Sequence, residues 1–364
     1  MPRKGSSGIA HGFEIGFHAC LDPTGKPVGR MPEFARDRKM LVALYRGLVL
    51  TRTFDEKAVA LQRTGRLGTY ASSLGQEAVS VGAAAAMRPD DVLLPSFREH
   101  GAQLWRGVSP VEIFQYWGGD ERGSDFSGPR EDFPVSIPVA SHIPHACGVA
   151  LAMKLRDEPR AALAIFGDGA TSKGDFYEAI NMAGVWELPA VFVICNNQWA
   201  ISVPRATQTA TETLAQKAFA AGIAGVQVDG NDAIAVRDVC ADALEKARGG
   251  GSATLIEAVT YRMGDHTTAD DARRYRSDDA VSPHWKEDPV ARLRAFLTQT
   301  LDWSREEEER LIETCRTDVE QAAATYLALK PEPLEAMFDW LFETLPQSLE
   351  SQRADMISKQ QSHD

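Results

Sequence analysis

The strongest constraint on the fold is an alternation of short apolar runs with helical segments between residues 161 and 262. The apolar runs are strand-like, and they lie at 161–166, 190–195, 225–228 and 253–261. Strands that alternate with helices form a parallel sheet, because each helix carries the chain back across a face of the sheet to the next strand. The sequence therefore predicts an α/β protein with a doubly wound parallel sheet and helices on both faces.

Two polar signatures stand just beyond the predicted strands. Gly-Asp-Gly follows the first strand at 167–169, and Asn-Asn follows the second strand at 196–197. If these two strands are neighbours, Asp168 and Asn197 lie side by side at the carboxyl edge of the sheet, where such proteins bind ligands. A carboxylate and a carboxamide are hard oxygen ligands that, with phosphate oxygens and a water, complete the octahedron that Mg²⁺ requires.

The glycines of the first signature indicate a site for phosphate. Gly167 and Gly169 permit a tight turn after the strand, and the helix that follows presents free N–H groups to an anion. The next glycine is Gly174, so the spacing differs from the GxGxxG fingerprint of dinucleotide-binding proteins, and no GxxxxGK[ST] loop occurs. A metal-bound diphosphate is therefore favoured over a nucleotide.

Composition disfavours several other classes of protein. A formal net charge of -12 argues against a nucleic-acid surface, which needs clustered Lys and Arg. Five cysteines without a CxxC pair predict neither a disulfide framework nor a thiolate zinc site. The longest apolar runs fall far short of the roughly 20 residues that cross a bilayer, and the first residues lack the apolar block of a signal peptide. We therefore expect a cytoplasmic protein.

The segments outside the alternating region complete the expected organisation. Residues 1–35 are rich in Gly and Pro with little periodicity, and are expected to form an extended N-terminal arm. Residues 36–364 are expected to form a single domain with a C-terminal helical tail.

Three helices are predicted from local signals in these outer segments. Apolar spacing predicts a helix over 36–66 that is broken near Thr51 and ended by Gly65. Capping boxes that begin at Ser109 and Ser304 predict two further helices.

The two polar signatures, taken together, resemble the GDG and NN motif of thiamine-diphosphate enzymes. Five further blocks stand in the order expected of the alpha subunit of the decarboxylating component of 2-oxo acid dehydrogenase complexes. These blocks are GRLGTYASSLGQEA (65–78), FREHGAQLWRG (97–107), NNQWAISVP (196–204), VDGND (228–232) and YRMGDHTTADDARRYRS (261–277). The resemblance covers roughly residues 20–350 and is closest to the bacterial pyruvate dehydrogenase type, built as a two-alpha, two-beta tetramer. It implies a thiamine-diphosphate-binding fold.

The resemblance implies the residues that bind the metal and the diphosphate. Asp168 and Asn197 match the side chains that bind Mg²⁺ on the cofactor. Trp199, where Tyr is commoner, matches the residue whose carbonyl oxygen completes the metal shell. Gly169 and Ala170 match backbone contacts to the diphosphate.

Other cofactor contacts are implied by matching positions elsewhere in the chain. Arg98 matches an arginine that binds the diphosphate, and Phe97 replaces the usual Tyr, so one hydroxyl contact is lost. Ile137 and Val139 match positions that contact the aminopyrimidine. His266 matches the loop histidine that approaches the cofactor and takes part in catalysis.

The substrate side of the site is implied less completely. Tyr70 matches the wall that faces the substrate, but Ala71 stands in a region where a human-type pyruvate enzyme has His. The charged loop 265–276 is expected to be mobile until the cofactor orders it.

The implied activity is the thiamine-diphosphate-dependent oxidative decarboxylation of pyruvate, with transfer of the acetyl unit to a lipoyl group on the acyltransferase core of the complex. The activating glutamate of the family belongs to the beta subunit, so this chain alone is expected to be inactive. Alternative substrates are the branched-chain acid 3-methyl-2-oxobutanoate and, with less support, acetoin. A nicotinamide-dependent dehydrogenase and a noncatalytic scaffold are the alternatives from other classes.

Overall fold

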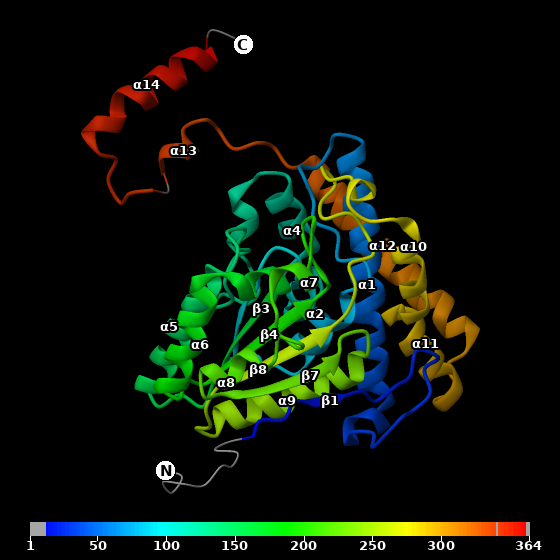
Figure 1. Ribbon diagram of the computed structural model, residues 1–364. Coiled ribbons are helices and arrows are strands. Elements are labelled where there is room, and N and C mark those ends of the chain that lie inside the picture. Colours follow the sequence, from blue (N-terminus) through cyan, green and yellow to red (C-terminus); the bar gives the residue numbers. More distant parts are fainter. Residues whose placement is uncertain (1–11, 340, 362–364) are drawn as a thin grey trace, which may run out of the picture. The chain divides into compact units, whose positions relative to one another are not determined.

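The computed structural model describes residues 12–339 and 341–361, so residues 1–11 of the expected N-terminal arm lie outside the described residues (Figure 1). The chain divides into two compact units, residues 1–323 and 324–364, and each is described by itself. Within the described residues, no helix combines the length and the apolar character needed to cross a membrane. The site discussed below lies in the first unit.

The first unit is built on a six-stranded sheet with the order β1-β7-β8-β4-β3-β2, in which every neighbouring pair is parallel. The strands are β1 (Gly16–His18), β2 (Val92–Leu94), β3 (Ala162–Gly167), β4 (Ala190–Asn196), β7 (Ala224–Asp229) and β8 (Thr254–Val259). The four strands predicted from apolar runs are confirmed. The two outermost strands, β1 and β2, were not predicted, because three residues are too few to establish a period of two.

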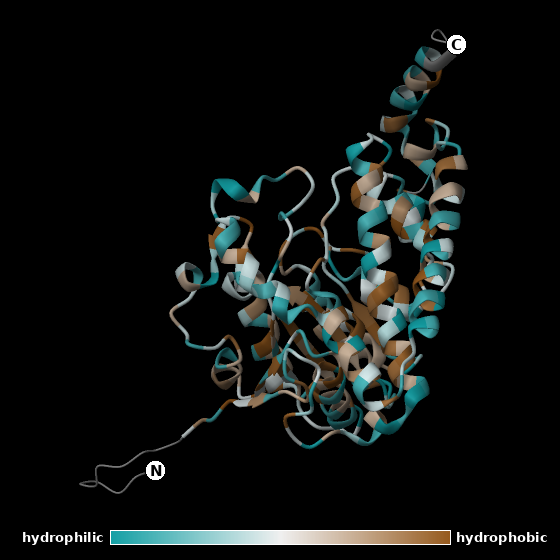
Figure 2. Ribbon diagram, turned by 90° about the vertical axis from the view of Figure 1, so that its right-hand side faces the viewer, coloured by the Kyte–Doolittle hydropathy of each residue, from teal (hydrophilic) through white to brown (hydrophobic). Residues whose placement is uncertain are grey.

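Helices cover both faces of this sheet, which confirms the doubly wound arrangement (Figure 1). On one face α5 (His142–Leu155) and α6 (Gly174–Val185) pack on alternate strand residues, among them Phe166 and Phe192, in one apolar cluster. On the other side of the sheet lie α1 (Arg38–Arg63), α2 (Glu77–Ala85) and α9 (Ala233–Arg248). Figure 2 shows the consequence: the strands are mainly apolar, and the helices around them are polar on their outward sides.

The long helix α1 is continuous, so the predicted break near Thr51 is wrong. The Thr51 hydroxyl donates to the carbonyl oxygen of Gly47, four residues earlier, at 2.7 Å, so its hydrogen-bonding requirement is met inside the helix. Asp37 caps the beginning of the helix with its side chain. At the other end Gly65 adopts a φ of +69°, a left-handed conformation that glycine accepts without strain, and this confirms the predicted end.

The capping boxes also correctly predict two helices. The box at Ser109 begins α4 (Pro110–Trp117), where the Ser109 and Glu112 side chains each accept a backbone N–H of the first turn. The box at Ser304 begins α12 (Arg305–Ala328), with the Glu307 N–H donating to Ser304 at 3.2 Å.

The remaining elements are short connections and the second unit. In the first unit they are α3 (His100–Arg106), β5 (Trp199–Ala200), β6 (Val203–Pro204), α7 (Arg205–Gln208), α8 (Lys217–Ala220), α10 (Asp278–Val281), α11 (Pro289–Thr300) and the 3-10 turns η1 (Glu33–Arg36), η2 (Glu121–Ser124), η3 (Asp168–Ser172), η4 (Ala272–Arg274) and η5 (Ser282–Glu287). The second unit holds the end of α12 together with α13 (Ala336–Asp339) and α14 (Gln347–Gln361).

The described part of the expected arm is attached to the body of the first unit. Its strand β1 pairs with β7, and the N–H groups of Cys20 and Leu21 donate to Asp232 at 2.7 and 2.6 Å. The other carboxylate oxygen of Asp232 caps α9. One buried carboxylate therefore joins the N-terminal segment to the helix layer.

Candidate cofactor site

The carboxyl edge of the sheet gathers the two polar signatures. Strands β3 and β4 are adjacent, with Gly167 opposite Cys195, so the residues that follow them emerge side by side. Asp168 is 2% exposed and Asn197 is 5% exposed, so both side chains are withdrawn from bulk water. The segments that follow β2 and β8, the strands on either side of this pair, carry Arg98 and His266, and the two side chains contact each other.

Asp168 is a buried carboxylate whose charge is only partly compensated. Burial raises the pKa of Asp168, while a hydrogen bond from Gln208 and the charge of Arg262 act in the opposite direction. The Gln208 Nε2 donates to the carboxylate Oδ2 at 2.8 Å. A desolvated carboxylate of this kind is stabilised by a cation placed next to it, which is what a metal site supplies.

The turn that carries Asp168 is held by its own hydrogen bonds. The Thr171 hydroxyl donates to the Asp168 carbonyl at 2.8 Å, and the buried Lys217 Nζ donates to the Thr171 carbonyl at 2.8 Å. These hydrogen bonds stabilise the 3-10 turn η3, which directly follows β3, and the longer helix α6 begins only at Gly174.

The structure requires a glycine at only one of the two positions in this turn. Gly167 has an ordinary φ of -75° and open space where a Cβ would stand, so the predicted need for backbone freedom there is wrong. At Gly169 the constraint is space, because an added Cβ would meet the Cβ of Ala200 at 2.7 Å. The close approach of the Ala200 hairpin is what requires a glycine.

This difference predicts opposite outcomes for two matched substitutions. Gly169→Ala is expected to lower the free energy of unfolding by about 1–3 kcal/mol, the usual cost of inserting a methyl group into a packed site. Gly167→Ala is expected to be neutral or to stabilise by up to about 1 kcal/mol, because it restricts only the unfolded chain. Denaturant unfolding of the two variants measures both, and equal losses would contradict the assignment.

Asn197 and Trp199 form a compact turn beyond β4. The Trp199 N–H donates to the Asn197 Oδ1 at 3.2 Å, and the Asn197 Nδ2 donates to the Gln76 Oε1 at 2.7 Å. The carbonyl oxygen of Trp199 accepts a longer contact of 3.3 Å from the Arg262 Nη1. The carboxamide and the carbonyl predicted as metal ligands are therefore both held in fixed directions.

Three basic side chains converge beside this turn. Arg98 and Arg262 are buried, and each has a guanidinium nitrogen 3.3 Å from the Nδ1 of His266. Arg98 also donates to the carbonyl oxygens of Ser72 and His266. Burial lowers the pKa of Arg98, and burial together with Arg98 lowers that of Arg262 to about 10. Such a concentration of desolvated positive charge is suited to an anion.

The surroundings of His266 define its charge and its tautomer. Two guanidinium donors face Nδ1, so this nitrogen accepts and the proton resides on Nε2. Burial, followed by Arg98 and Arg262, lowers the pKa of His266 to about 4. At neutral pH the ring is therefore uncharged, and its N–H donor is on the side away from the arginines.

A titration of His266 is expected to show this directly. With ¹⁵N-labelled histidine, the His266 signals should remain those of the neutral Nε2–H tautomer as the pH falls through 6.5, and should change only near pH 4. In Arg262→Met, one positive neighbour is lost, so the midpoint should move up toward 6.5. A wild-type midpoint near 6.5 would contradict the proposed arrangement.

The other predicted site residues differ in how far they are buried. Phe97 packs edge-on to His266, with ring centroids 5.8 Å apart. Ile137 and Val139 precede α5 and are each 49% exposed, while Ala170 is buried in η3. Tyr70 is fully buried, and its hydroxyl donates to Asp55 at 2.9 Å. The contact of Tyr70 with a substrate stays a prediction.

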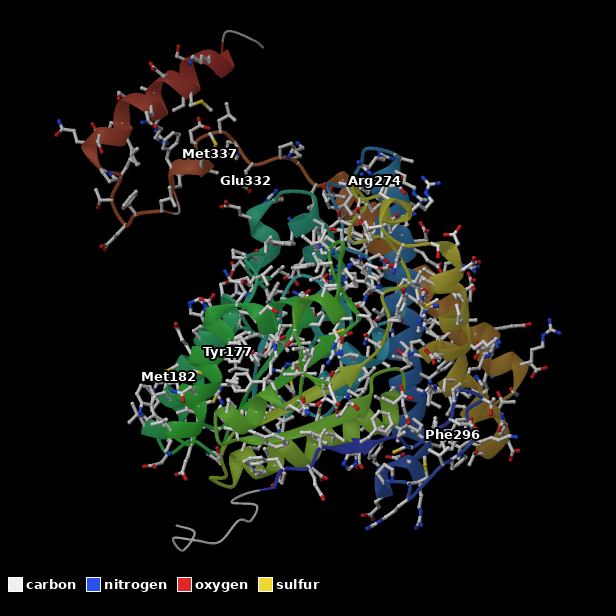
Figure 3. All side chains as sticks on the ribbon, viewed as in Figure 1. Tyr177, Met182, Arg274, Phe296, Glu332 and Met337 are labelled. Carbon is white, nitrogen blue, oxygen red and sulfur yellow. The ribbon has the colours of Figure 1, made fainter. Side chains whose placement is uncertain are left out.

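The charged loop 265–276 is docked on the body by several contacts. The N–H of Thr268 donates to the Tyr70 carbonyl at 2.8 Å, and the Tyr70 N–H donates to the Thr268 hydroxyl at 2.9 Å. Arg276 donates to three backbone carbonyls just before the loop, including that of Met263 at 3.0 Å. Figure 3 marks this loop by Arg274 and marks α6 by Tyr177 and Met182. Opening of the loop has to break these contacts.

Four residues of the site were not singled out from the sequence, namely Asp55, Gln76, Gln208 and Arg262. Only Asp55 carried a usable signal, because a charged residue stands in the apolar stripe of α1 between Leu48 and Ala58. The others acquire a role solely through contacts between segments distant in the sequence.

The donor set fits a metal-bound diphosphate. It combines one buried carboxylate, one carboxamide and one backbone carbonyl with two buried arginines and a turn without room for a side chain at Gly169. Among the described residues, no group of three or more His, Cys, Asp or Glu side chains could hold a metal ion, so a metal beside Asp168 must take its further ligands from the amide, the carbonyl or the cofactor.

Comparison with known proteins places the chain in a family. The profile of the family described as dehydrogenase E1 component matches residues 45–333, and the chain belongs to this family. The expected family is therefore confirmed, and the enzymes of this family depend on thiamine diphosphate.

Individual relatives extend over nearly the whole chain. It is 38% identical over 335 residues to "Pyruvate dehydrogenase E1 component subunit alpha" of Staphylococcus aureus (strain Mu50 / ATCC 700699), covering 91% of this chain and 90% of the relative. It is 40% identical to the Bacillus cereus protein of the same name, covering 88% and 86%. It is also 42% identical to "3-methyl-2-oxobutanoate dehydrogenase subunit alpha" of Mycobacterium tuberculosis (strain CDC 1551 / Oshkosh), covering 84% and 83%.

Proposed function

We propose that the chain is the alpha subunit of a pyruvate dehydrogenase E1 component, which decarboxylates pyruvate with thiamine diphosphate and passes the acetyl unit to a lipoyl carrier. The observation that carries the proposal is the buried Asp168 carboxylate beside Asn197, in a family whose enzymes use this cofactor. The names of the Staphylococcus aureus and Bacillus cereus relatives support pyruvate as the substrate.

The metal and the diphosphate are assigned to the edge of the sheet. The side chains of Asp168 and Asn197 and the carbonyl of Trp199 would hold Mg²⁺. The Trp199 carbonyl now accepts the long contact from Arg262, so binding replaces or shares that contact. Arg98 and the backbone of Gly169 and Ala170 would bind the diphosphate oxygens.

The remaining residues serve the reactive part of the cofactor. When bound, thiamine diphosphate supplies a carbanion and an electron sink for loss of CO₂. Ile137 and Val139 would lie against the aminopyrimidine. His266 is neutral at physiological pH, so its Nε2–H can donate a hydrogen bond without bringing a third positive charge to the two arginines.

The proposal includes partners that complete the site. We assign the chain to a two-alpha, two-beta tetramer, whose beta subunit supplies the activating glutamate, and to a complex with a lipoyl acyltransferase core. The half-exposed apolar side chains of Ile137 and Val139 support a covering partner. All five cysteines are free and buried, which supports a reducing cytoplasm.

A second candidate substrate is 3-methyl-2-oxobutanoate. The Mycobacterium tuberculosis relative with this name is 42% identical, which is similar to the identity with the pyruvate relatives. Acetoin, the third candidate, has no support in the relatives reported above.

The test is turnover of the chain produced together with its beta subunit. Decarboxylation is measured with pyruvate and with 3-methyl-2-oxobutanoate, each with and without thiamine diphosphate and Mg²⁺. Cofactor-dependent turnover with a higher kcat/KM for pyruvate is expected, and a higher value for the branched acid would select the second candidate. A verified tetramer without turnover on either substrate would overturn the proposal.

A further inference from the structure

A buried glutamine stands directly behind the proposed metal ligand Asn197. Gln76 lies on the turn before α2 and is 3% exposed. Its Oε1 accepts a hydrogen bond of 2.7 Å from the Asn197 Nδ2 and a weaker one of 3.4 Å from the Cys195 Sγ. The glutamine therefore contacts the strand end and the ligand that follows it.

The direction of this hydrogen bond is fixed by the backbone. Side-chain amides can be turned by half a rotation without a change of shape, so their orientation has to follow from their partners. The Trp199 N–H can only donate, and it contacts the Asn197 Oδ1 at 3.2 Å. The Nδ2 of Asn197 must then face Gln76, and Gln76 must present its oxygen to it.

The other end of the same amide is unpaired. The Nε2 of Gln76 is buried and has no hydrogen-bond partner among residues 12–339 and 341–361. A buried donor left in this state has lost its hydrogen bond to water without gaining another. The donor lies on the side chain that orients a proposed metal ligand, so an oxygen acceptor that arrives with the metal diphosphate would supply the missing hydrogen bond.

We propose that Gln76 is a positioning residue for the metal site, an inference that rests on the proposed function. Its Oε1 holds the carboxamide of Asn197 so that Oδ1 keeps a lone pair for the metal, and its Nε2 donates to an oxygen of the bound metal diphosphate. Outer partners of this kind fix the direction of a ligand and tune the affinity of the site.

The test compares three variants of the chain assembled with its beta subunit. Gln76→Leu removes both the acceptor and the donor, whereas Gln76→Glu keeps an acceptor for Asn197 and removes the donor. Gln115→Leu is the matched control, because Gln115 is also buried but its amide donates to Asp120 in the α4 region. Calorimetry measures the Kd for Mg²⁺ with saturating thiamine diphosphate and, separately, the Kd for thiamine diphosphate with saturating Mg²⁺. Thermal unfolding of each assembly is recorded in parallel.

Gln76→Leu is expected to raise the Kd for Mg²⁺ by about 10- to 100-fold, and Gln115→Leu is expected to leave it at the wild-type value. Gln76→Glu should recover much of the Mg²⁺ affinity but bind thiamine diphosphate more weakly, because a carboxylate there repels the diphosphate. A wild-type Mg²⁺ affinity in Gln76→Leu, or an equal loss in Gln115→Leu, would overturn the inference. If Gln76→Leu fails to assemble, unchanged thiamine-diphosphate affinity in Gln76→Glu overturns it. Failure of the wild-type assembly to bind Mg²⁺ would instead overturn the proposed function.

Discussion

Asp168→Asn is expected to weaken Mg²⁺ binding in the presence of thiamine diphosphate by at least about 100-fold and to remove turnover. Loss of a direct charged ligand should exceed the roughly 10- to 100-fold effect of losing an outer partner. The fold should survive, because burial raises the pKa of Asp168, which means that the folded protein disfavours its charge. A neutral amide of the same shape removes this penalty and can still accept the Gln208 donor.

The measurement separates the metal role from a structural role. Metal affinity by calorimetry and the free energy of unfolding are recorded for Asp168→Asn and for Asp90→Asn, an exposed aspartate before β2, at the opposite edge of the sheet. Unfolding of Asp168→Asn should require as much denaturant as the wild type, or more. Retained Mg²⁺ affinity, or a large loss of stability together with the loss of affinity, would show that Asp168 supports the fold instead.

The core of the fold could be predicted because it depends on local patterns. The runs that became β3, β4, β7 and β8 are long enough to be identified by their residue types, and capping boxes encode the beginning of α4 and α12. The adjacency of β3 and β4 then brought Asp168 and Asn197 together. The predicted helix break near Thr51 was wrong, because the hydroxyl of Thr51, which is unfavourable in isolated helices, is satisfied by the carbonyl of Gly47.

The supporting shell of the site could not be predicted in the same way. Gln76 and Arg262 are ordinary polar residues of their loops, and each acquires its role by contacting the turn after β4 across more than 60 positions of sequence. The state of His266 is also a product of packing, because its lowered pKa needs both burial and two arginines from separate loops. A motif predicts which residues meet a ligand, and tertiary contacts fix their direction and charge.

The second large effect is expected at Asp55, which lies inside the first unit and is 4% exposed. Its carboxylate accepts the Tyr70 hydroxyl at 2.9 Å, the Ser72 hydroxyl at 2.6 Å and the Ser73 N–H at 2.7 Å. These three donors form one segment, and the carbonyl of Ser72 in turn accepts from Arg98. Asp55 therefore holds the wall on which the proposed diphosphate arginine rests.

Asp55→Ala is expected to lower the free energy of unfolding by about 3–5 kcal/mol, because each buried donor left unpaired costs about 1–3 kcal/mol. Tyr70→Phe removes a single donor and leaves the others paired, so it should cost only about 1 kcal/mol. Denaturant unfolding gives both values. The affinity for thiamine diphosphate should also fall more in Asp55→Ala than in Tyr70→Phe. The reason is that Arg98 donates to the carbonyl of Ser72, and this segment is displaced when Asp55 is lost. Equal effects of the two substitutions would mean that water replaces the carboxylate and that Asp55 does not organise the site.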